Sequence, residues 1–170
     1  NGNYYNRFYC VHPDGAVRHY DKKHLFTFGG EHKRFTAGTE RVVVNFRGVR
    51  ILLEVCYDLR FPVWSRNLGD YDMILYVASW PTPRVDAWSA LLRARAIENQ
   101  CYVAGVNRMG VDPACEYSGG SAIIDPYGKT IAECPWSRES AVSADIDMEA
   151  LQAFRKKFPV LDDADPFTLI

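Results

Sequence analysis

The sequence predicts an α/β fold with a partly parallel sheet, and three successive stretches support this. Residues 73–79, MILYVAS, form a nearly continuous apolar run, as expected for a strand that is buried on both faces. Residues 84–100 change to a helical period, with their large apolar side chains on one stripe. A second apolar run, residues 101–107, follows at once. This order predicts a strand–helix–strand unit, which is right-handed by default.

Two antiparallel hairpins are expected before this unit. Residues 4–11 and 16–21 are strand-like and flank His-Pro-Asp-Gly, where proline and glycine suit the second and fourth positions of a type I turn. Residues 41–46 and 49–55 flank an Arg-Gly pair in the same manner. The parallel part of the sheet is therefore expected to be extended by antiparallel strands.

After this unit, residues 120–134 predict a hairpin around Asp-Pro-Tyr-Gly, and residues 140–147 predict one more strand. Residues 148–158 are expected to form a short amphipathic helix, and residues 159–170 an extended arm. The arm has apolar residues near its end, which favour docking onto a surface or a partner: Phe167, Leu169 and Ile170.

The size and composition of the chain favour a single folded domain over residues 1–170. A hydrophobic fraction of 48% in 170 residues is enough for a substantial core. The 20 basic and 21 acidic residues are spread along the chain, so there is no basic stripe for nucleic acid. No apolar run approaches the roughly 20 residues that span a bilayer. We expect neither a nucleic-acid nor a membrane partner.

The cysteines and histidines argue against disulfide and metal chemistry. Five cysteines are present without any C-x-x-C pair, which is unlike a disulfide scaffold or a structural zinc site and indicates a reducing compartment. The four histidines do not show H-E-x-x-H spacing. We therefore expect a cytoplasmic location, no metal and no cofactor.

Cys56 occupies the position in the sequence that most favours chemistry. It ends the strand-like run 51–56, which is apolar except for Glu54. The carboxyl ends of strands in α/β sheets are where ligand crevices open, so a thiol placed there faces substrate. The competing interpretation is packing, because a buried cysteine is more often a small hydrophobe. We keep that interpretation for the other four: Cys10, Cys101, Cys115 and Cys134.

Four stretches together resemble the nitrilase superfamily, the carbon–nitrogen hydrolases that cleave amides or nitriles through a cysteine thiol. They are YDKKHLF, LLEVCYDLRFP, SALLRARAIENQCYVAGVNRMG and YSGGSAIIDPYGK, in the family's order and over nearly all of the chain. The stretches GEHKRFTAG and CYDLRFPVWSRN are most similar to the omega-amidase branch, which deamidates 2-oxo acid amides such as 2-oxoglutaramate. The resemblance implies an αββα sandwich, two packed sheets flanked by helices, and a homodimer or higher homo-oligomer.

The resemblance also implies a catalytic set. The nucleophile maps to Cys56, and the lysine of the K-x-H-L pattern maps to Lys22 rather than Lys23. A supporting glutamate maps to Glu31, in a loop whose length varies. The competing interpretations are a solvated strand-edge lysine and an ordinary loop carboxylate.

The general base of the family has no counterpart in this sequence. It is a glutamate in a strand well upstream of the lysine, and neither Asp14 nor Asp21 fits that pattern. The chain also begins directly in a strand-like segment without a cap. We therefore expect that the N-terminal strands and helices of the domain, together with the base, are missing from this chain, and that it is inactive alone.

Four residues are candidates for substrate binding. The backbone N–H of Tyr57 follows the nucleophile and suits a second oxyanion donor beside the lysine. Trp80, at the end of the next strand, is a candidate pocket wall. A carboxylate on the substrate would require a cation, and Arg60 and Arg84 are the available residues.

Other polar residues near these motifs have structural explanations. We expect Asp58 and Arg60 to form a local ion pair or to brace the loop. His24 and His32 are expected to be structural or supporting, although a papain-like pair of Cys56 with one imidazole is a competing mechanism.

The sequence thus predicts a thiol-dependent amidase that acts on a small 2-oxo acid amide and releases ammonia. Two alternatives remain open. The chain is another amide or carbamoyl hydrolase of the same superfamily, or it is a catalytically silent module that keeps the fold for assembly or binding.

Overall fold

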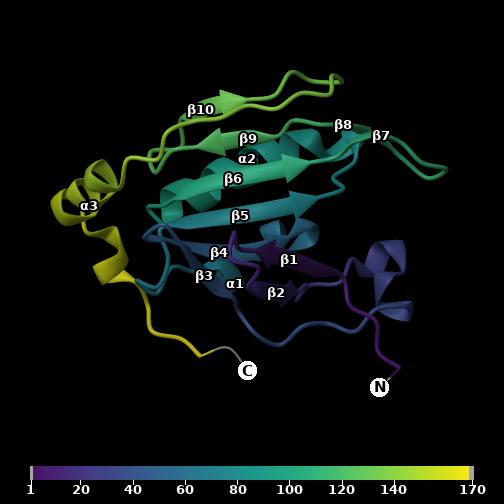
Figure 1. Cartoon of the computed structure of the whole chain (residues 1–170), viewed down its shortest axis with the longest axis horizontal. Helices are drawn as coiled ribbons and strands as arrows, with labels where there is room; N and C mark the ends of the chain where they lie inside the picture. The colour runs from purple at the N-terminus through teal and green to yellow at the C-terminus, as the bar shows by residue number, and fades with distance from the viewer. Residues whose placement is uncertain (1, 169–170) are drawn as a thin grey trace.

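The computed structural model describes residues 2–168, and its centre is one six-stranded sheet (Figure 1). Only the two central strand pairs are parallel, and the remaining pairs are antiparallel. In spatial order the strands are β10 (Thr130–Glu133), β9 (Ala122–Ile124), β6 (Tyr102–Asn107), β5 (Met73–Ala78), β4 (Val49–Val55) and β3 (Val43–Phe46).

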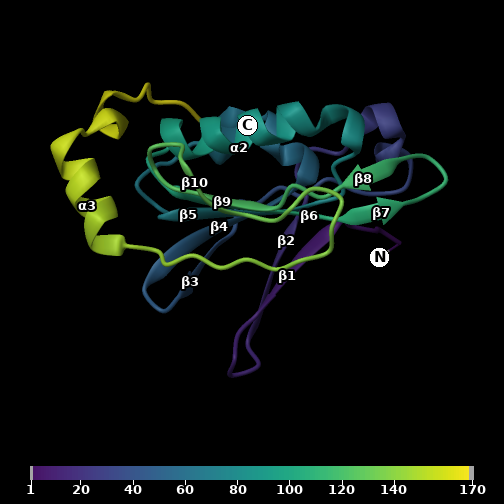
Figure 2. The ribbon, with the colours of Figure 1, turned by 90° about the horizontal axis from the view of Figure 1, so that it is seen from above.

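The predicted strand–helix–strand unit is confirmed. Helix α2 (Val85–Glu98) connects β5 to β6, which pair in parallel, and it lies along one face of the sheet (Figure 2). Trp88 and Leu92 of the helix are buried and approach the backbone of Gly105 on β6 so closely that a Cβ there would lie 2.6–2.7 Å from their side chains. This close contact fixes the helix against the strands that carry the site.

Both N-terminal hairpins are confirmed as well. Strands β1 (Arg7–Val11) and β2 (Val17–Asp21) form a separate two-stranded sheet on the face opposite α2 (Figure 2). The Gly15 N–H donates to the His12 carbonyl at 2.9 Å, as a turn over these four residues requires. The second hairpin joins β3 to β4 through Arg47 and Gly48, both with positive φ, and these two residues form a tight two-residue turn.

The strand expected at residues 140–147 does not form. This segment runs as a single line beneath the sheet in Figure 2 and pairs with no described strand. It is held instead by isolated contacts, in which the Cys134 thiol donates to the Ser140 carbonyl and the Asp147 N–H donates to the Tyr102 hydroxyl. The strand prediction for residues 140–147 is therefore wrong.

The C-terminal helix is confirmed as α3 (Met148–Lys157), with the Asp147 side chain accepting a hydrogen bond from the Ala150 N–H at its start. Arg155 ties this helix to the sheet by donating to Asp72. Beyond it, Phe167 is 42% exposed, and the expected docking of the arm onto a surface or a partner stays a prediction. Leu169 and Ile170, which we also expected to dock, lie outside the described residues.

Several short elements were not predicted from the sequence. They are α1 (Pro62–Ser65), the hairpin β7 (Met109–Val111) and β8 (Glu116–Ser118), and the 3-10 turns η1 (Thr27–Gly29), η2 (Glu31–Lys33), η3 (Cys56–Arg60), η4 (Thr82–Arg84) and η5 (Val160–Asp163). Within residues 2–168, no helix has the length and apolar character needed to cross a membrane.

Candidate active site

Cys56 lies at the carboxyl end of β4, beside the carboxyl end of the parallel strand β5. Its φ is 49°, in the left-handed region that non-glycine residues rarely adopt, because β4 turns directly into η3 at this residue. Such a conformation costs on the order of 1–3 kcal/mol and persists only where the surroundings enforce it. The thiol points across the strand ends, where it donates to the Ser79 carbonyl at 3.9 Å.

A cavity of about 450 Å³ opens at this edge of the sheet. It is formed by the ends of β4 and β5, by η3 and η4, and by the loop that follows β2. Its lining residues are Asn6, Lys22, Phe26, Glu31, Val55, Cys56, Tyr57, Arg60, Val77, Ala78, Ser79, Trp80, Pro81 and Arg84. All seven site residues expected from the sequence are therefore brought together in one cavity.

Lys22 and Glu31 form a nearly buried ion pair in this cavity. The Lys22 side chain is 3% exposed, and its Nζ lies 2.6 Å from Glu31 Oε2. Its backbone is fixed on both sides, since the Lys22 N–H donates to Asn6 and its carbonyl accepts from Gly38. Gly38 is required at that contact, because a Cβ would lie 2.0 Å from the Asp21 carbonyl. Lys22 is thus not a solvated strand-edge lysine.

Lys23 points elsewhere, as expected for adjacent residues of an extended chain. Its Nζ lies 5.1 Å from the centre of the Trp64 ring, and it is absent from the cavity lining. Lys22, and not Lys23, therefore shares the cavity with Cys56.

Glu31 is held by three donors: Lys22 Nζ, the Phe26 N–H at 2.6 Å and the Asn6 side-chain amide at 2.8 Å. Partial burial alone would favour the neutral acid, but these hydrogen bonds and the Lys22 charge together lower the pKa of Glu31. Glu31 is therefore a fixed carboxylate at neutral pH. A carboxylate with this many donors and a lowered pKa is a poor proton acceptor.

The Cys56 thiol has a raised pKa. Burial has the largest effect, and the nearby carboxylates of Glu31 and Asp58 add to it, while the Lys22 charge and a backbone hydrogen bond with Ser79 oppose it. The thiol is therefore mostly protonated at neutral pH. Nucleophilic attack would require a base that removes the proton as the new bond forms.

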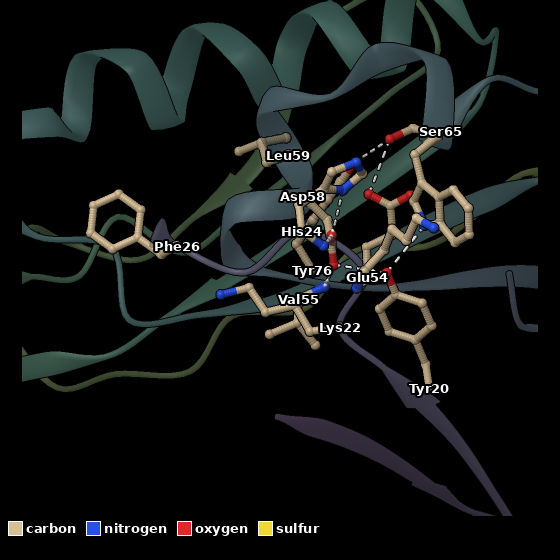
Figure 3. Close-up of polar contacts among 12 residues, drawn as sticks. Tyr20, Lys22, His24, Phe26, Glu54, Val55, Asp58, Leu59, Ser65 and Tyr76 are labelled. Atoms are coloured by element: carbon tan, nitrogen blue, oxygen red, sulfur yellow. Dashed lines mark hydrogen bonds and ion pairs between the residues drawn. The ribbon is translucent and has the colours of Figure 1, made fainter. Parts of the chain in front are cut away.

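Asp58 braces the site from behind, but it does not pair with Arg60 as we expected. One oxygen accepts from the backbone N–H of His24 and from its ring Nδ1, both at 2.9 Å. The other accepts from the Tyr20 hydroxyl at 2.8 Å and the Val55 N–H at 3.1 Å (Figure 3). Four nearby donors within the protein satisfy this buried carboxylate, so a solvent-facing arginine is not needed.

The histidines do not support a papain-like pair. His24 is held by Asp58 and stacks on the Phe61 ring at a centroid distance of 3.9 Å. Neither His24 nor His32 is among the residues that line the cavity. The expectation that both are structural or supporting is consistent with these positions, and the competing Cys/His mechanism has no geometric basis in residues 2–168.

The two arginines enter the cavity without a carboxylate partner. Arg60 lies over the Trp80 ring at 5.0 Å and Arg84 over the Phe26 ring at 5.4 Å, both within cation–π range. Neither forms an ion pair with any residue between 2 and 168. Since the Glu31 charge is matched by Lys22, the cavity carries two unmatched positive charges.

Trp80 forms a wall of the cavity and is 3% exposed. Its backbone is fixed by Asn107 on β6, whose side chain accepts from the Trp80 N–H at 2.7 Å and donates to the Trp80 carbonyl at 3.0 Å. Tyr57 also lines the cavity, and its ring packs edge-on against Phe26.

Sequence reasoning missed Asn6, Phe26, Ser79 and Asn107. Asn6 and Phe26 matter because they hold Glu31, and Ser79 and Asn107 because they fix the end of β5. Position at a strand end was a usable signal for Ser79 and Asn107. No local pattern marked Asn6, which lies 25 residues from its partner Glu31.

Comparisons with known proteins agree with this geometry. Residues 1–156 match the family described as carbon-nitrogen hydrolase. The omega-amidase YafV of Escherichia coli strain K12 is 55% identical over 165 residues, which cover 96% of this chain and 64% of that protein. The 2-oxoglutaramate amidase of Bacillus subtilis is 40% identical over 166 residues, with the same coverage of 96% and 64%.

A similar structure has also been solved. The crystal structure of a CN-hydrolase superfamily protein from Xanthomonas campestris, with an arsenic adduct in its active site, matches with a TM-score of 0.94 and 48% identity. The match covers 97% of this chain and 65% of that one. The chain therefore spans 64% of the length of the first two relatives and 65% of the solved structure.

Proposed function

Because the chain belongs to the carbon-nitrogen hydrolase family and has its nitrilase-type α/β fold, we propose that it carries the nucleophile of a thiol-dependent amidase. The observation that supports this most strongly is the nearly buried Lys22–Glu31 ion pair in the same cavity as Cys56. Burying such an ion pair costs desolvation free energy, and charged groups buried in a cavity are often functional. Stabilising the oxyanion that forms when a thiol attacks an amide is a function that fits this pair.

In the proposed reaction the Cys56 sulfur attacks the carboxamide carbon and its proton passes to a base. The negative charge that develops on the carbonyl oxygen is stabilised by the Lys22 ammonium and the Tyr57 N–H. Each such donor is worth on the order of 3 kcal/mol in comparable sites. Ammonia leaves with a proton returned by the base, and water then hydrolyses the thioester to the acid and the free thiol.

Glu31 is not the base in this proposal. It holds the Lys22 ammonium in place, and its three hydrogen bonds leave it with a lowered pKa. It is also the sole acidic residue in the cavity lining that the structure describes. We therefore place the base on a carboxylate from outside the described residues, within hydrogen-bond reach of the thiol or one water away.

The proposed substrate is a small 2-oxo acid amide such as 2-oxoglutaramate. Support comes from the two unmatched arginines, because a guanidinium binds a carboxylate through two parallel hydrogen bonds. The relatives named as omega-amidase and 2-oxoglutaramate amidase support the same substrate class. We further propose that the natural protein completes an αββα sandwich and assembles as a homodimer or higher homo-oligomer.

Ammonia release from 2-oxoglutaramate by the natural protein tests this function directly. We expect turnover by the natural protein and none by residues 1–170 alone, because the cavity of the latter offers the thiol no free carboxylate. Turnover of a carbamoyl compound or another amide in place of 2-oxoglutaramate would favour a different branch of the family. Absence of any turnover by the natural protein would favour the catalytically silent module. Activity of residues 1–170 alone would instead indicate that Glu31 acts as the base.

Replacing Arg60 and Arg84 by glutamine tests the substrate class. Loss of a hydrogen-bonded ion pair to the substrate carboxylate is expected to raise KM for 2-oxoglutaramate by about 10- to 100-fold, since such bonds contribute about 1.5–3 kcal/mol. KM for an uncharged short-chain amide should stay unchanged. Arg93→Gln, on the exposed side of α2, is the matched control. Equal effects on charged and uncharged amides would contradict a carboxylate anchor.

A further inference from the structure

Two fully buried carboxyl groups bracket the cysteine in the sequence. Glu54 lies on β4 two residues before Cys56, and Asp58 lies on η3 two residues after it, and both are 0% exposed. Figure 3 draws both together with Lys22. Neither lines the cavity, so neither is positioned to touch a substrate.

Asp58 connects the lysine segment to the cysteine turn. It accepts from Tyr20 and His24, which flank Lys22, and from Val55, which precedes Cys56. Because all of these groups donate, Asp58 serves as an ionised acceptor. Its charge therefore sets the position of the oxyanion-stabilising lysine relative to the nucleophile.

Glu54, unlike Asp58, has few hydrogen-bond donors around its carboxyl group. Its Oε2 accepts from the Ser65 hydroxyl at 3.0 Å, and its Oε1 has no hydrogen-bond partner among residues 2–168. An ionised carboxylate with an unpartnered buried oxygen is strongly disfavoured, whereas an uncharged carboxyl tolerates this site better.

The charged and titratable groups packed around Glu54 come from several elements. Asp58 on η3 is negative, and Tyr76 on β5 is neutral and shares the Ser65 hydroxyl. Arg95 on α2 is positive and acts to lower the pKa of Glu54; it donates to Glu98 and to the Leu59 carbonyl, and its Nε has no hydrogen-bond partner among residues 2–168. The other titratable groups around it are Tyr20 on β2, Tyr71 and Cys101. Burial and then the Asp58 charge raise the pKa of Glu54 to about 8.

We propose that Glu54 is a positioning residue of the cysteine turn, which must stay uncharged so that Asp58 can stay charged and hold Lys22 and Cys56 together. This inference rests on the proposed function, since it concerns the same thiol and lysine. Ionisation of Glu54 places a second negative charge in the same buried region. The repulsion is relieved only if η3 moves away with Cys56 or if Asp58 takes up a proton and weakens its four hydrogen bonds.

The sign of the stability effect follows from the direction of the shift. The pKa of Glu54 is higher in the folded state than its ordinary value of 4.5. Its contribution to the free energy of unfolding is therefore fully present below pH 4.5. That contribution is lost progressively as the pH rises toward about 8. The alkaline limit of activity should fall at the upper end of this interval, near pH 8.

The test is Glu54→Gln in the natural protein, which keeps the size and the hydrogen bond to Ser65 but cannot ionise. We expect kcat of the wild type to decline above pH 8, with about a tenth remaining one pH unit higher, whereas Glu54→Gln keeps more than about half. Glu133→Gln, an exposed residue on β10, is the control and should follow the wild type. An alkaline limb at the same pH in Glu54→Gln and wild type would overturn the proposal and assign that limb to another group.

Two further measurements do not depend on turnover. The difference in unfolding free energy between wild type and Glu54→Gln should change steadily from pH 4.5 to about 8 and be constant outside that range. The infrared carbonyl band of a protonated carboxylic acid should be present in the wild type at pH 7 and lost above pH 8. A wild type that shows no such band at pH 7 would overturn the proposal, even if the variant fails to fold. If 2-oxoglutaramate is not hydrolysed at all, the proposed function fails while these two measurements still decide the state of Glu54.

Discussion

Cys56→Ala in the natural protein is expected to lower kcat for amide hydrolysis by about four orders of magnitude or more while the fold is kept. Removal of a nucleophile in comparable enzymes leaves only the rate that binding and oxyanion stabilisation supply. The loss of stability should be about 1 kcal/mol or less, because Cys56 is only half-buried and its backbone is already strained, with φ at 49°. Ammonia release and thermal unfolding measure the two effects separately.

Cys115→Ala is the matched control for this prediction. Cys115 is also half-buried and free, but it lies in the β7–β8 hairpin outside the cavity lining. Its replacement should leave turnover within about twofold of the wild type. A Cys56→Ala variant that unfolds together with its loss of activity would instead indicate that this thiol is mainly a packing residue.

The parts of the fold that follow local periodicity could be predicted from the sequence. The change from a continuous apolar run to a helical stripe and back located β5, α2 and β6, because burial on both faces of a parallel sheet leaves a distinctive pattern. The same reasoning placed Cys56 at a strand end. The strand predicted at residues 140–147 does not form, because the local sequence does not show whether a neighbouring strand is available for pairing.

The site could be predicted as a set of residues but not as a set of contacts. The motifs selected Lys22, Glu31 and Cys56, and the structure brings these residues into one cavity. They gave no indication that Asp58 accepts from Tyr20, 38 residues earlier in the chain, or that Asn6 holds Glu31. Such contacts depend on how separate elements pack. Of the two roles expected for Asp58, bracing the loop agrees with these contacts, whereas the local ion pair with Arg60 does not form.

Asp58→Asn is the prediction with the largest expected effect on stability, and it also lowers activity. The replacement keeps the shape of the side chain but turns one acceptor oxygen into an NH₂ donor. In one orientation the NH₂ group faces the His24 N–H and Nδ1, and in the other it faces the Tyr20 hydroxyl and the Val55 N–H, so two donors lose their acceptor in either case. Leaving buried donors unpaired in this way costs about 1–3 kcal/mol for each group affected. We therefore expect the unfolding free energy of the natural protein to fall by about 3–5 kcal/mol.

Activity should fall for a separate reason, because the Lys22 segment and the Cys56 turn lose their shared anchor. A displacement of about 1 Å between nucleophile and oxyanion donor can lower kcat by about 10²-fold. KM should change little, since Asp58 does not line the cavity. The readouts are kcat and KM for 2-oxoglutaramate at a temperature at which the variant is fully folded by circular dichroism.

Asp112→Asn is the matched control, because Asp112 also accepts several hydrogen bonds, from the Ala114 and Cys115 N–H groups and the Tyr117 hydroxyl, but in the exposed turn between β7 and β8. This variant should keep kcat near the wild-type value. An Asp58→Asn protein that is fully folded and has wild-type kcat would show that the cysteine turn and the lysine segment keep their positions without this carboxylate. In that case the requirement for an uncharged Glu54 beside a charged Asp58 would lose its structural reason as well.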